Sequence, residues 1–506
     1  HAPRSGRSAC PRMGNVVPKK KLPKFLRKSK SSKTNSGSTS PTSDASVSTQ
    51  SPRTTSPSPP SSNGRQEDPP SKSPRALPLP KSPRVELPQE YYRRDSQSST
   101  DTGIPARVRK AAKAITDGDA FLLFAGSGFL ADSGLSLHKE LTEVPQYRSR
   151  GLSYAGLGDP CWLDSDLSLF YGFWGTLFND FRWSRPHEGY SILASWREKF
   201  FHGTAASESI KQRTKSGMEN YVESSDDPDP YKCRAHEAAG AFFIFTSNVD
   251  AHFFDYFGAT EVRECHGNVE LWQCSNVCSK RVWRAPRSYI FRVDLRNMLA
   301  SDPPGTNMDS GVDEMTATKI EMRRSEAEQR ESGREERKMG KRRRDWARIK
   351  WLENLPATED TNAVREMFGR PNRPICPLCK APARPNVLMA SDLGWIDNTA
   401  QEKRWCSWLQ AVKDESQGSQ GNKRRVPPLN VVIMEIGAGL TTVPTARATS
   451  QSVAGRLEQS GANVTMVRIN PSTPGPDGAK GARLKHFIDL RLKGLEALKM
   501  INEEVQ

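Results

Sequence analysis

The feature that most constrains the fold of this chain is a set of four short apolar runs, each followed directly by small or polar residues. The runs are continuous rather than alternating, which is typical of strands in a parallel sheet covered by helices on both faces. Ligands bind such sheets outside the carboxyl ends of the strands, so we expect the residues after the four runs to lie along one edge. The runs and the residues that follow them are "AFLLFA" (120–125) before "GSG", "AFFIF" (241–245) before "TSNVD", "NVVIMEI" (430–436) before "GAG", and "NVTMVRI" (463–469) before "NPSTPG".

Composition separates this sheet-forming part from two biased segments. Only 35% of the 506 residues are hydrophobic and 37 are proline, so part of the chain is expected not to fold. Residues 1–105 are rich in Ser, Pro, Lys and Arg, which predicts a disordered basic tail. Residues from about 301 to 370 contain a charged stretch of helix-forming composition without a sustained apolar stripe, interpreted as a solvated helix or a flexible insertion. No apolar run approaches the roughly 20 residues that cross a bilayer.

The first strand leads into the stretch "GSGFLADSGL" (126–135). Gly126, Ser127 and Gly128 at the strand end would let backbone N–H groups approach a pyrophosphate. The spacing differs from the G-x-G-x-x-G pattern of ordinary dinucleotide folds. The alternative is a strand-to-helix turn that needs glycine only for a positive φ.

The cysteines suggest a metal site. Cys274 and Cys278 form C-x3-C, and Cys376 and Cys379 form C-x2-C, so four thiolates can surround a structural Zn²⁺ ion tetrahedrally. Nine cysteines with two close pairs fit metal ligands in a reducing compartment better than a disulfide framework. The alternative is four unrelated reduced cysteines.

Three polar residues are candidates for catalysis or binding. His266 lies between an expected strand, "TEVREC", and the first cysteine pair, where a cleft between sheet and metal module is expected. Asn248 and Asp250 follow the second apolar run and would either hydrogen-bond a carboxamide or ribose, or cap a helix. The aromatic-rich stretch 159–183 is expected to be helical, with most of its aromatic side chains in a core.

Taken in order, these motifs resemble those of the sirtuins, the NAD-dependent protein deacylases. The matching pieces span residues 110–475 approximately and are "GSGFLADSGL", "TSNVD", "CHG", "CSNVC" with "CPLC", "RPNV", "GAGLTTVP" and "RIN". The resemblance implies that the carbonyl oxygen of an acyl-lysine displaces nicotinamide from NAD, with His266 as general base on a ribose hydroxyl. It implies that Asn248 and Asp250 orient the nicotinamide end and a water, and that zinc is structural. The NAD-binding residues it implies are Gly126, Ser127, Gly128, Lys139, Asn248, Asp250, Gly437, Gly439 and Asn470.

The sequence departs from the family pattern around the nicotinamide pocket. Ser136–Lys139 stand where the family has Pro-Asp-Phe-Arg, and Lys139 keeps the charge without the planar fork of arginine. Ser247 replaces a glutamine, and Gly437-Ala438-Gly439 replaces Gly-Thr-Ser. These departures leave two alternatives open: mono-ADP-ribosyl transfer or NAD hydrolysis on the same fold, and a catalytically weak NAD-sensing scaffold.

The resemblance also implies the domain organisation: an α/β fold, with a Rossmann-like parallel-sheet domain, a smaller zinc-binding module and a helical insertion. The whole catalytic domain is expected over 106–500. Its large NAD-binding part is expected at about 106–150, 236–262 and 384–500, and its small part at 151–235 (helical) and 263–383 (zinc module).

The net charge of +17 bears on partners and location. The resemblance implies an acyl-lysine protein as the substrate, such as a histone or another basic protein. Eight Lys or Arg and no acid lie between Met13 and Lys33, which favours contact with nucleic acid or an anionic membrane. The alternatives are a nuclear-localisation signal and a solvated linker. Nucleus or cytoplasm is the first expectation for location. Membrane anchoring through myristoylated Gly14 ranks lower, because Pro18 stands where that motif prefers Ser or Thr.

Overall fold

The computed structural model describes a large part of the chain beyond residue 102. The chain divides into two units, His1–Ser99 and Thr100–Gln506, and every described residue belongs to the second. The expected tail up to residue 102, the loop Ser136–Lys139 and the part of the charged insertion over 301–360 lie outside the described residues. The described ranges are 103–135, 142, 144–219, 221–222, 228–233, 237–294, 296–300, 361–390, 392–421, 428–439, 445–473, 475–476 and 484–506.

A six-stranded sheet forms the large part, in the order β3-β2-β1-β7-β8-β9, with every neighbouring pair parallel. The expected α/β class with a parallel sheet is confirmed. Ala125 lies opposite Thr246 and Ile436, and Ile436 lies opposite Ile469, so the four apolar runs end at one edge as expected. The strands are β1 (Ala120–Ala125), β2 (Phe242–Thr246), β3 (Val262–Glu264), β7 (Asn430–Ile436), β8 (Asn463–Ile469) and β9 (His486–Leu490).

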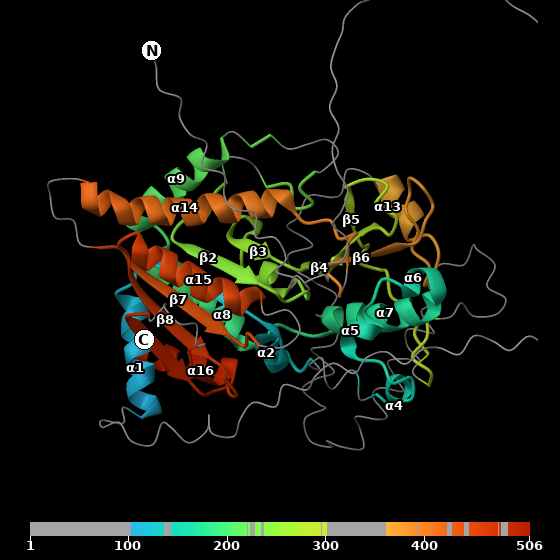
Figure 1. Ribbon diagram of the computed structural model, residues 1–506, viewed down its shortest axis with the longest axis horizontal. Helices are drawn as coiled ribbons and strands as arrows, with labels where there is room; N and C mark the ends of the chain where they lie inside the picture. The colour runs from blue at the N-terminus through green and yellow to red at the C-terminus, as the bar shows by residue number, and fades with distance from the viewer. Residues whose placement is uncertain are drawn as a thin grey trace, which may run out of the picture. The chain divides into compact units, whose positions relative to one another are not determined.

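Helices cover both faces of this sheet, which explains why its central strands are apolar on both sides (Figure 1). On one face lie α14 (Thr399–Gly421) and α15 (Thr445–Gln459), and on the other lie α1 (Ile104–Thr116) and α16 (Gly494–Val505). On α14, Trp405 and Trp408 pack against Phe243 of β2. Among the described residues, no helix has the length and apolarity needed to span a membrane.

The small module is built on a second sheet of three antiparallel strands in the order β5-β4-β6. These strands are β4 (Gly267–Cys274), β5 (Val282–Arg284) and β6 (Ala383–Val387). The long helix α7 (Leu167–Trp183) supplies much of its separate core, where Tyr171, Trp272 and Phe291 are buried. The helical expectation for the aromatic-rich stretch is therefore confirmed. Four shorter helices belong to the same part: α4 (Pro145–Arg148), α5 (Tyr154–Leu157), α6 (Trp162–Ser165) and α13 (Thr361–Met367).

The division between the two parts differs from the expected boundaries. Helices α8 (Glu188–Trp196) and α9 (Ala205–Met218) pack against α16 and α14, because their apolar side chains join the core of the large sheet. Conversely, β6 belongs to the small sheet, since β4 pairs with it along its second edge. The remaining short elements are α2 (Ser127–Leu130), η2 (Ala131–Ser133), η3 (Arg197–Phe201), η4 (His252–Asp255) and η5 (Ala259–Glu261).

Three glycines allow the loops after β1 and β7 to touch backbone to backbone. A Cβ on Gly126 would lie 2.7 Å from the Ala438 Cα, and one on Gly128 would lie 2.8 Å from the Gly437 Cα. The two loops are also joined by a hydrogen bond of 3.0 Å from the Gly128 N–H to the Gly437 carbonyl. Gly126 and Gly128 do not have a positive φ, whereas Gly437 does, at 62°. The glycines after β1 are thus required by close approach between two strand ends.

Gly126→Ala tests this contact. The added methyl group would overlap backbone that cannot rotate away, so we expect the free energy of unfolding to fall by about 1–3 kcal/mol. Gly455→Ala is the matched control, because a Cβ there meets nothing within 4 Å on helix α15. That control should be neutral or stabilising by up to about 1 kcal/mol. Urea unfolding of both variants provides the measurement, and equal stability of the two would contradict the packing role.

Candidate functional site

His266 lies where the chain passes from the large sheet into the small one. Cys265 separates it from the end of β3, and it directly precedes the first residue of β4. Gly267 has a φ of 68°, and a Cβ there would lie 1.9 Å from the Asn386 carbonyl oxygen of β6. The glycine therefore lets the chain turn tightly against β6, while the Leu388 amide donates to the His266 carbonyl at 2.9 Å. The imidazole is half-buried, and its Nε2 lies 3.1 Å from the hydroxyl oxygen of Thr445, the first residue of α15.

Asn248 carries an unsatisfied donor at the same edge. Its residue is only 4% exposed, and its backbone N–H donates to the Thr246 hydroxyl at 3.0 Å. Its side-chain nitrogen Nδ2 is buried and has no hydrogen-bond partner among the described residues. A buried amide donor without a partner costs free energy, so it points to a ligand or water that accepts from it.

Asp250 is engaged within the protein by a histidine that the sequence analysis missed. The Asp250 Oδ2 lies 2.9 Å from the His252 Nδ1, in an ion pair that is not aligned as a hydrogen bond, and the Tyr190 hydroxyl donates to the same oxygen at 3.4 Å. On the other side of the ring, the His252 Nε2 lies 3.0 Å from the Phe181 carbonyl oxygen. Burial disfavours the imidazolium, but the Asp250 carboxylate outweighs this and raises the pKa of His252. The only sequence signal was a histidine two positions after Asp250.

The loop after β7 and the turn after β8 face each other. Asn470 donates from Nδ2 to the Ala438 carbonyl at 3.2 Å, and its Oδ1 accepts from the Ser472 and Thr473 amides at 2.9 Å each. Both ends of the Asn470 amide are therefore used to hold the two segments together. Gly439 is exposed, and the structure gives its amide no hydrogen-bond acceptor among the described residues.

A buried ionic cluster of residues from β7, β8 and α15 lies next to these two segments. Glu435 of β7 and Arg468 of β8 are neighbours in register, both 0% exposed, with the Arg468 Nε 2.8 Å from the Glu435 Oε1. Arg447 of α15 approaches the same carboxylate at 3.8 Å. Burial raises the pKa of Glu435, although the two arginines oppose the shift. The sequence did contain a signal for this buried ion pair, since Glu435 and Arg468 each interrupt an apolar run one residue before its end.

The predicted cofactor residues are thus largely brought to one edge. Gly126, Ser127 and Gly128 lie at the end of β1, next to Gly437 and Gly439 at the end of β7. Asn248 and Asp250 follow β2, and Asn470 follows β8. Lys139 lies outside the described residues, as do positions 440–444 of the "GAGLTTVP" motif.

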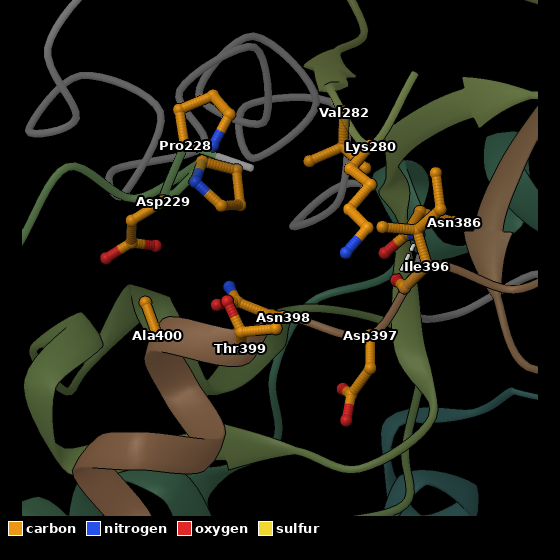
Figure 2. A pocket seen from close by; sticks show the side chains of 11 residues that line it. Pro228, Asp229, Lys280, Val282, Asn386, Ile396, Asp397, Asn398, Thr399 and Ala400 are labelled. Atoms are coloured by element: carbon orange, nitrogen blue, oxygen red, sulfur yellow. Dashed lines mark hydrogen bonds between the residues drawn. The ribbon is translucent and has the colours of Figure 1, made fainter. Parts of the chain in front are cut away.

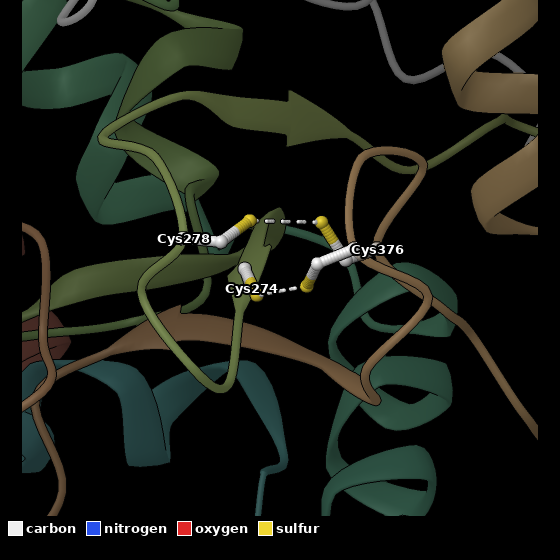
Figure 3. Close-up of side chains that lie close together, drawn as sticks. Cys274, Cys278 and Cys376 are labelled. Carbon is white, nitrogen blue, oxygen red and sulfur yellow. Dashed lines mark hydrogen bonds between the residues drawn. The ribbon is translucent and has the colours of Figure 1, made fainter. Parts of the chain in front are cut away.

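The four predicted cysteines form a cluster in the small module (Figure 3). Their sulfurs all lie within 4.8 Å of one another, with Cys274 and Cys379 at 3.4 Å and Cys278 and Cys376 at 3.5 Å. A tetrahedral zinc ion with Zn–S bonds of about 2.3 Å separates its sulfurs by about 3.8 Å. The donor set and the spacing therefore fit one tetrahedral metal ion, with no position left for substrate. No other cluster of this kind occurs in the part of the chain that the structure describes.

A pocket lies elsewhere, between the start of α14 and the small sheet (Figure 2). Asp229, Lys280 and Asp397 line it, but His266 and Asn248 do not. Asp397 is held in a bidentate contact by the Arg263 guanidinium at 2.7 and 2.8 Å, and the Asn386 amide donates to the Ile396 carbonyl at 2.8 Å. The contacts of Arg263 and Asn386 hold the segment just before α14 against β3 and β6.

Comparisons with known proteins give matches in structure only. No family model and no curated protein matches the sequence. One similar solved structure is a complex of a Sir2 homologue with NAD, with 12% identity and a TM-score of 0.37 over 78% of this chain and 93% of that one. Another is a mutant of Sir2 homologues in complex with 2′-O-acetyl ADP ribose, with 12% identity and a TM-score of 0.37 over 78% and 95%. The functional assignments below therefore rest on the residues of this chain.

Cys379→Ser tests the metal site. The purified protein is expected to hold one zinc ion per chain, and loss of one thiolate should release most of the metal and lower the melting temperature. Cys161→Ser, at another exposed cysteine outside the cluster, is the control and should keep both properties. Elemental analysis and thermal melts measure these effects. A wild-type protein that binds no zinc when zinc is added during reconstitution would contradict the assignment.

His252→Asn tests the buried ion pair. A raised pKa contributes stability that is fully present below the unfolded-state pKa of about 6.5 and is lost as the pH rises through the folded-state value. The variant should therefore be destabilised more at about pH 5.5 than at about pH 9, as measured by urea unfolding. His202→Asn is the control, because that side chain is 58% exposed and should show a much smaller difference. A pH-independent effect of His252→Asn would refute the charged pair.

Proposed function

We propose that this chain is an NAD-dependent protein-lysine deacylase of the sirtuin type, which transfers the acyl group to ADP-ribose and releases nicotinamide. The observation that carries the proposal is the convergence of three groups from separate segments at one sheet edge. They are the half-buried imidazole of His266, the unpartnered buried amide of Asn248, and the exposed Gly439 in the loop after β7. His266 directly precedes β4, the strand that ends at Cys274 of the four-cysteine cluster.

The residues present fit a dinucleotide in two respects. The Asn248 Nδ2 is a buried donor in need of an acceptor, such as the oxygen of a carboxamide. The loop after β7 offers an exposed glycine amide without a described acceptor, which suits a phosphate oxygen. The glycines after β1 act differently, since Gly126 and Gly128 are covered by the backbone of the β7 loop. Their role in binding is to place that loop.

The bound dinucleotide supplies a ribose carbon that becomes electrophilic as nicotinamide departs. His266 takes a proton from a ribose hydroxyl, a task suited to imidazole near neutral pH. The Thr445 hydroxyl lies 3.1 Å from the His266 Nε2, and a ribose hydroxyl that gives its proton to this nitrogen takes the place of that contact. Asn248 orients the leaving end of the dinucleotide. Asp250 fixes the segment that carries Asn248 through its contact with the buried His252.

One observation favours a second reaction on the same site. Where the family has Gln, Thr and Ser, this chain has Ser247, Ala438 and Gly439, so three polar side chains are shortened or missing. The Ala438 carbonyl is drawn inward by Asn470 and by Arg447 at 3.3 Å. A less crowded site would admit water or a protein nucleophile, giving NAD hydrolysis or mono-ADP-ribosyl transfer.

His266→Ala tests the proposed base. Formation of O-acyl-ADP-ribose from NAD and acyl-lysine peptides should fall by about 10²–10⁴-fold, because the proton on the ribose hydroxyl loses its acceptor. The dissociation constant for NAD should change only a few-fold. Mass spectrometry of the products and calorimetry measure these effects.

His202→Ala is the control for this experiment, since that exposed histidine pairs only locally with Glu198, and it should retain full activity. A His266→Ala variant that deacylates at the wild-type rate would sink the assignment. Free ADP-ribose from the wild type would instead indicate hydrolysis, and a modified protein would indicate transfer. NAD binding without any release of nicotinamide would favour a sensor.

A further inference from the structure

Arg447 joins the two segments that flank the proposed dinucleotide site. It lies in the first turn of α15 and is 2% exposed. Its Nη1 donates to the Ala438 carbonyl at 3.3 Å, on the loop after β7. The same nitrogen donates to the Thr473 carbonyl and hydroxyl at 3.0 and 3.1 Å, and Nη2 donates to the Gly475 carbonyl at 3.3 Å, both on the turn after β8.

These contacts decide which way the loop presents its amide. In a trans peptide the carbonyl and the following N–H point in opposite directions. Because Arg447 and Asn470 both draw the Ala438 carbonyl into the protein, the Gly439 N–H points outward. The exposed amide assigned above to a phosphate oxygen therefore owes its direction to a guanidinium beneath it.

The guanidinium is itself held in position. Glu435 lies below it at 3.8 Å and is fixed by the Arg468 Nη2, which donates at 3.0 Å, and by the Ser450 hydroxyl. Arg468 also donates from Nη1 to the Gly475 carbonyl at 2.7 Å, so both arginines converge on the same turn. A lysine at position 447 would keep the charge, but its single nitrogen could not also make the contact of Nη2 with the Gly475 carbonyl.

We propose that Arg447 is a positioning residue that sets the affinity for the dinucleotide by locking the loop after β7 to the turn after β8. The inference rests on the proposed function and deepens it. Arg447 acts through the backbone of Ala438–Gly439 and through the carbonyls of Thr473 and Gly475, not by touching the reacting atoms. Its loss should leave these segments free to move, so that part of the binding free energy is spent on ordering them.

The experiment compares Arg447→Met, Arg447→Lys and a control in full-length, zinc-loaded protein. For Arg447→Met we expect the dissociation constants of NAD and ADP-ribose, and the KM for NAD, to rise by about tenfold to a hundredfold. The kcat at saturating NAD and the KM for the acyl peptide should stay within about twofold. The reason is that the lost contacts stabilise bound NAD equally in the ground state and in the transition state. Arg447→Lys should lie between wild type and Arg447→Met. It also provides the readout if the methionine variant fails to fold.

Arg404→Met is the matched control, because it removes another buried arginine, whose partner at 2.7 Å is Asp229 and belongs to neither the loop after β7 nor the turn after β8. It should cost thermal stability without changing either dissociation constant. Unchanged affinity in both Arg447 variants, or an equal loss of affinity in Arg404→Met, would overturn the inference. Absence of NAD binding by the wild type would instead remove the proposed function, and with it the basis of this inference.

Discussion

The close approach of two backbone segments, one after β1 and one after β7, organises the rest of this molecule. At the Gly126–Gly128 contact with Gly437, no side chain separates the strand ends, and the segments are joined by a direct amide-to-carbonyl bond. This pairing brings the loop after β7 over the end of β1, beside the turn after β8. Asn470, at the start of that turn, donates to the Ala438 carbonyl of the loop. A buried ionic cluster then holds it from the α15 side.

A single passage of chain connects this edge to the small module. His266 separates the last residue pairs of the large sheet from the first of the small one, and its neighbour Gly267 packs directly on the Asn386 carbonyl. The imidazole therefore occupies a place where both sheets determine its position, and Thr445 contacts it from α15. The first turn of α15 thus contacts both His266, through Thr445, and the segments after β7 and β8, through Arg447.

The sheet edge and the cysteine cluster were predictable from sequence because each depends on local pattern. Continuous apolar runs indicate buried parallel strands, and two close cysteine pairs indicate four ligands. The partners of individual side chains were not predictable in this way. Asp250 meets His252 and Tyr190, and Arg447 meets carbonyls about 26 and 28 residues further along the chain. The allocation of α8 and α9 to the large core likewise depends on contacts with distant helices, which no local periodicity encodes.

The pairing of β4 with β6 has a consequence for the long stretch of chain between them. Cys274 lies opposite Ala383, and the second cysteine pair lies just before β6, so strand pairing and sulfur cluster fasten the two ends of one large loop. The entropy of closing a loop rises only with the logarithm of its length, by about 0.6 kcal/mol for each doubling. The 60 residues from 301 to 360 are therefore an inexpensive place for the chain to have grown. Relatives of this protein can differ widely in length there while keeping the paired strands β4 and β6 and the four-cysteine cluster.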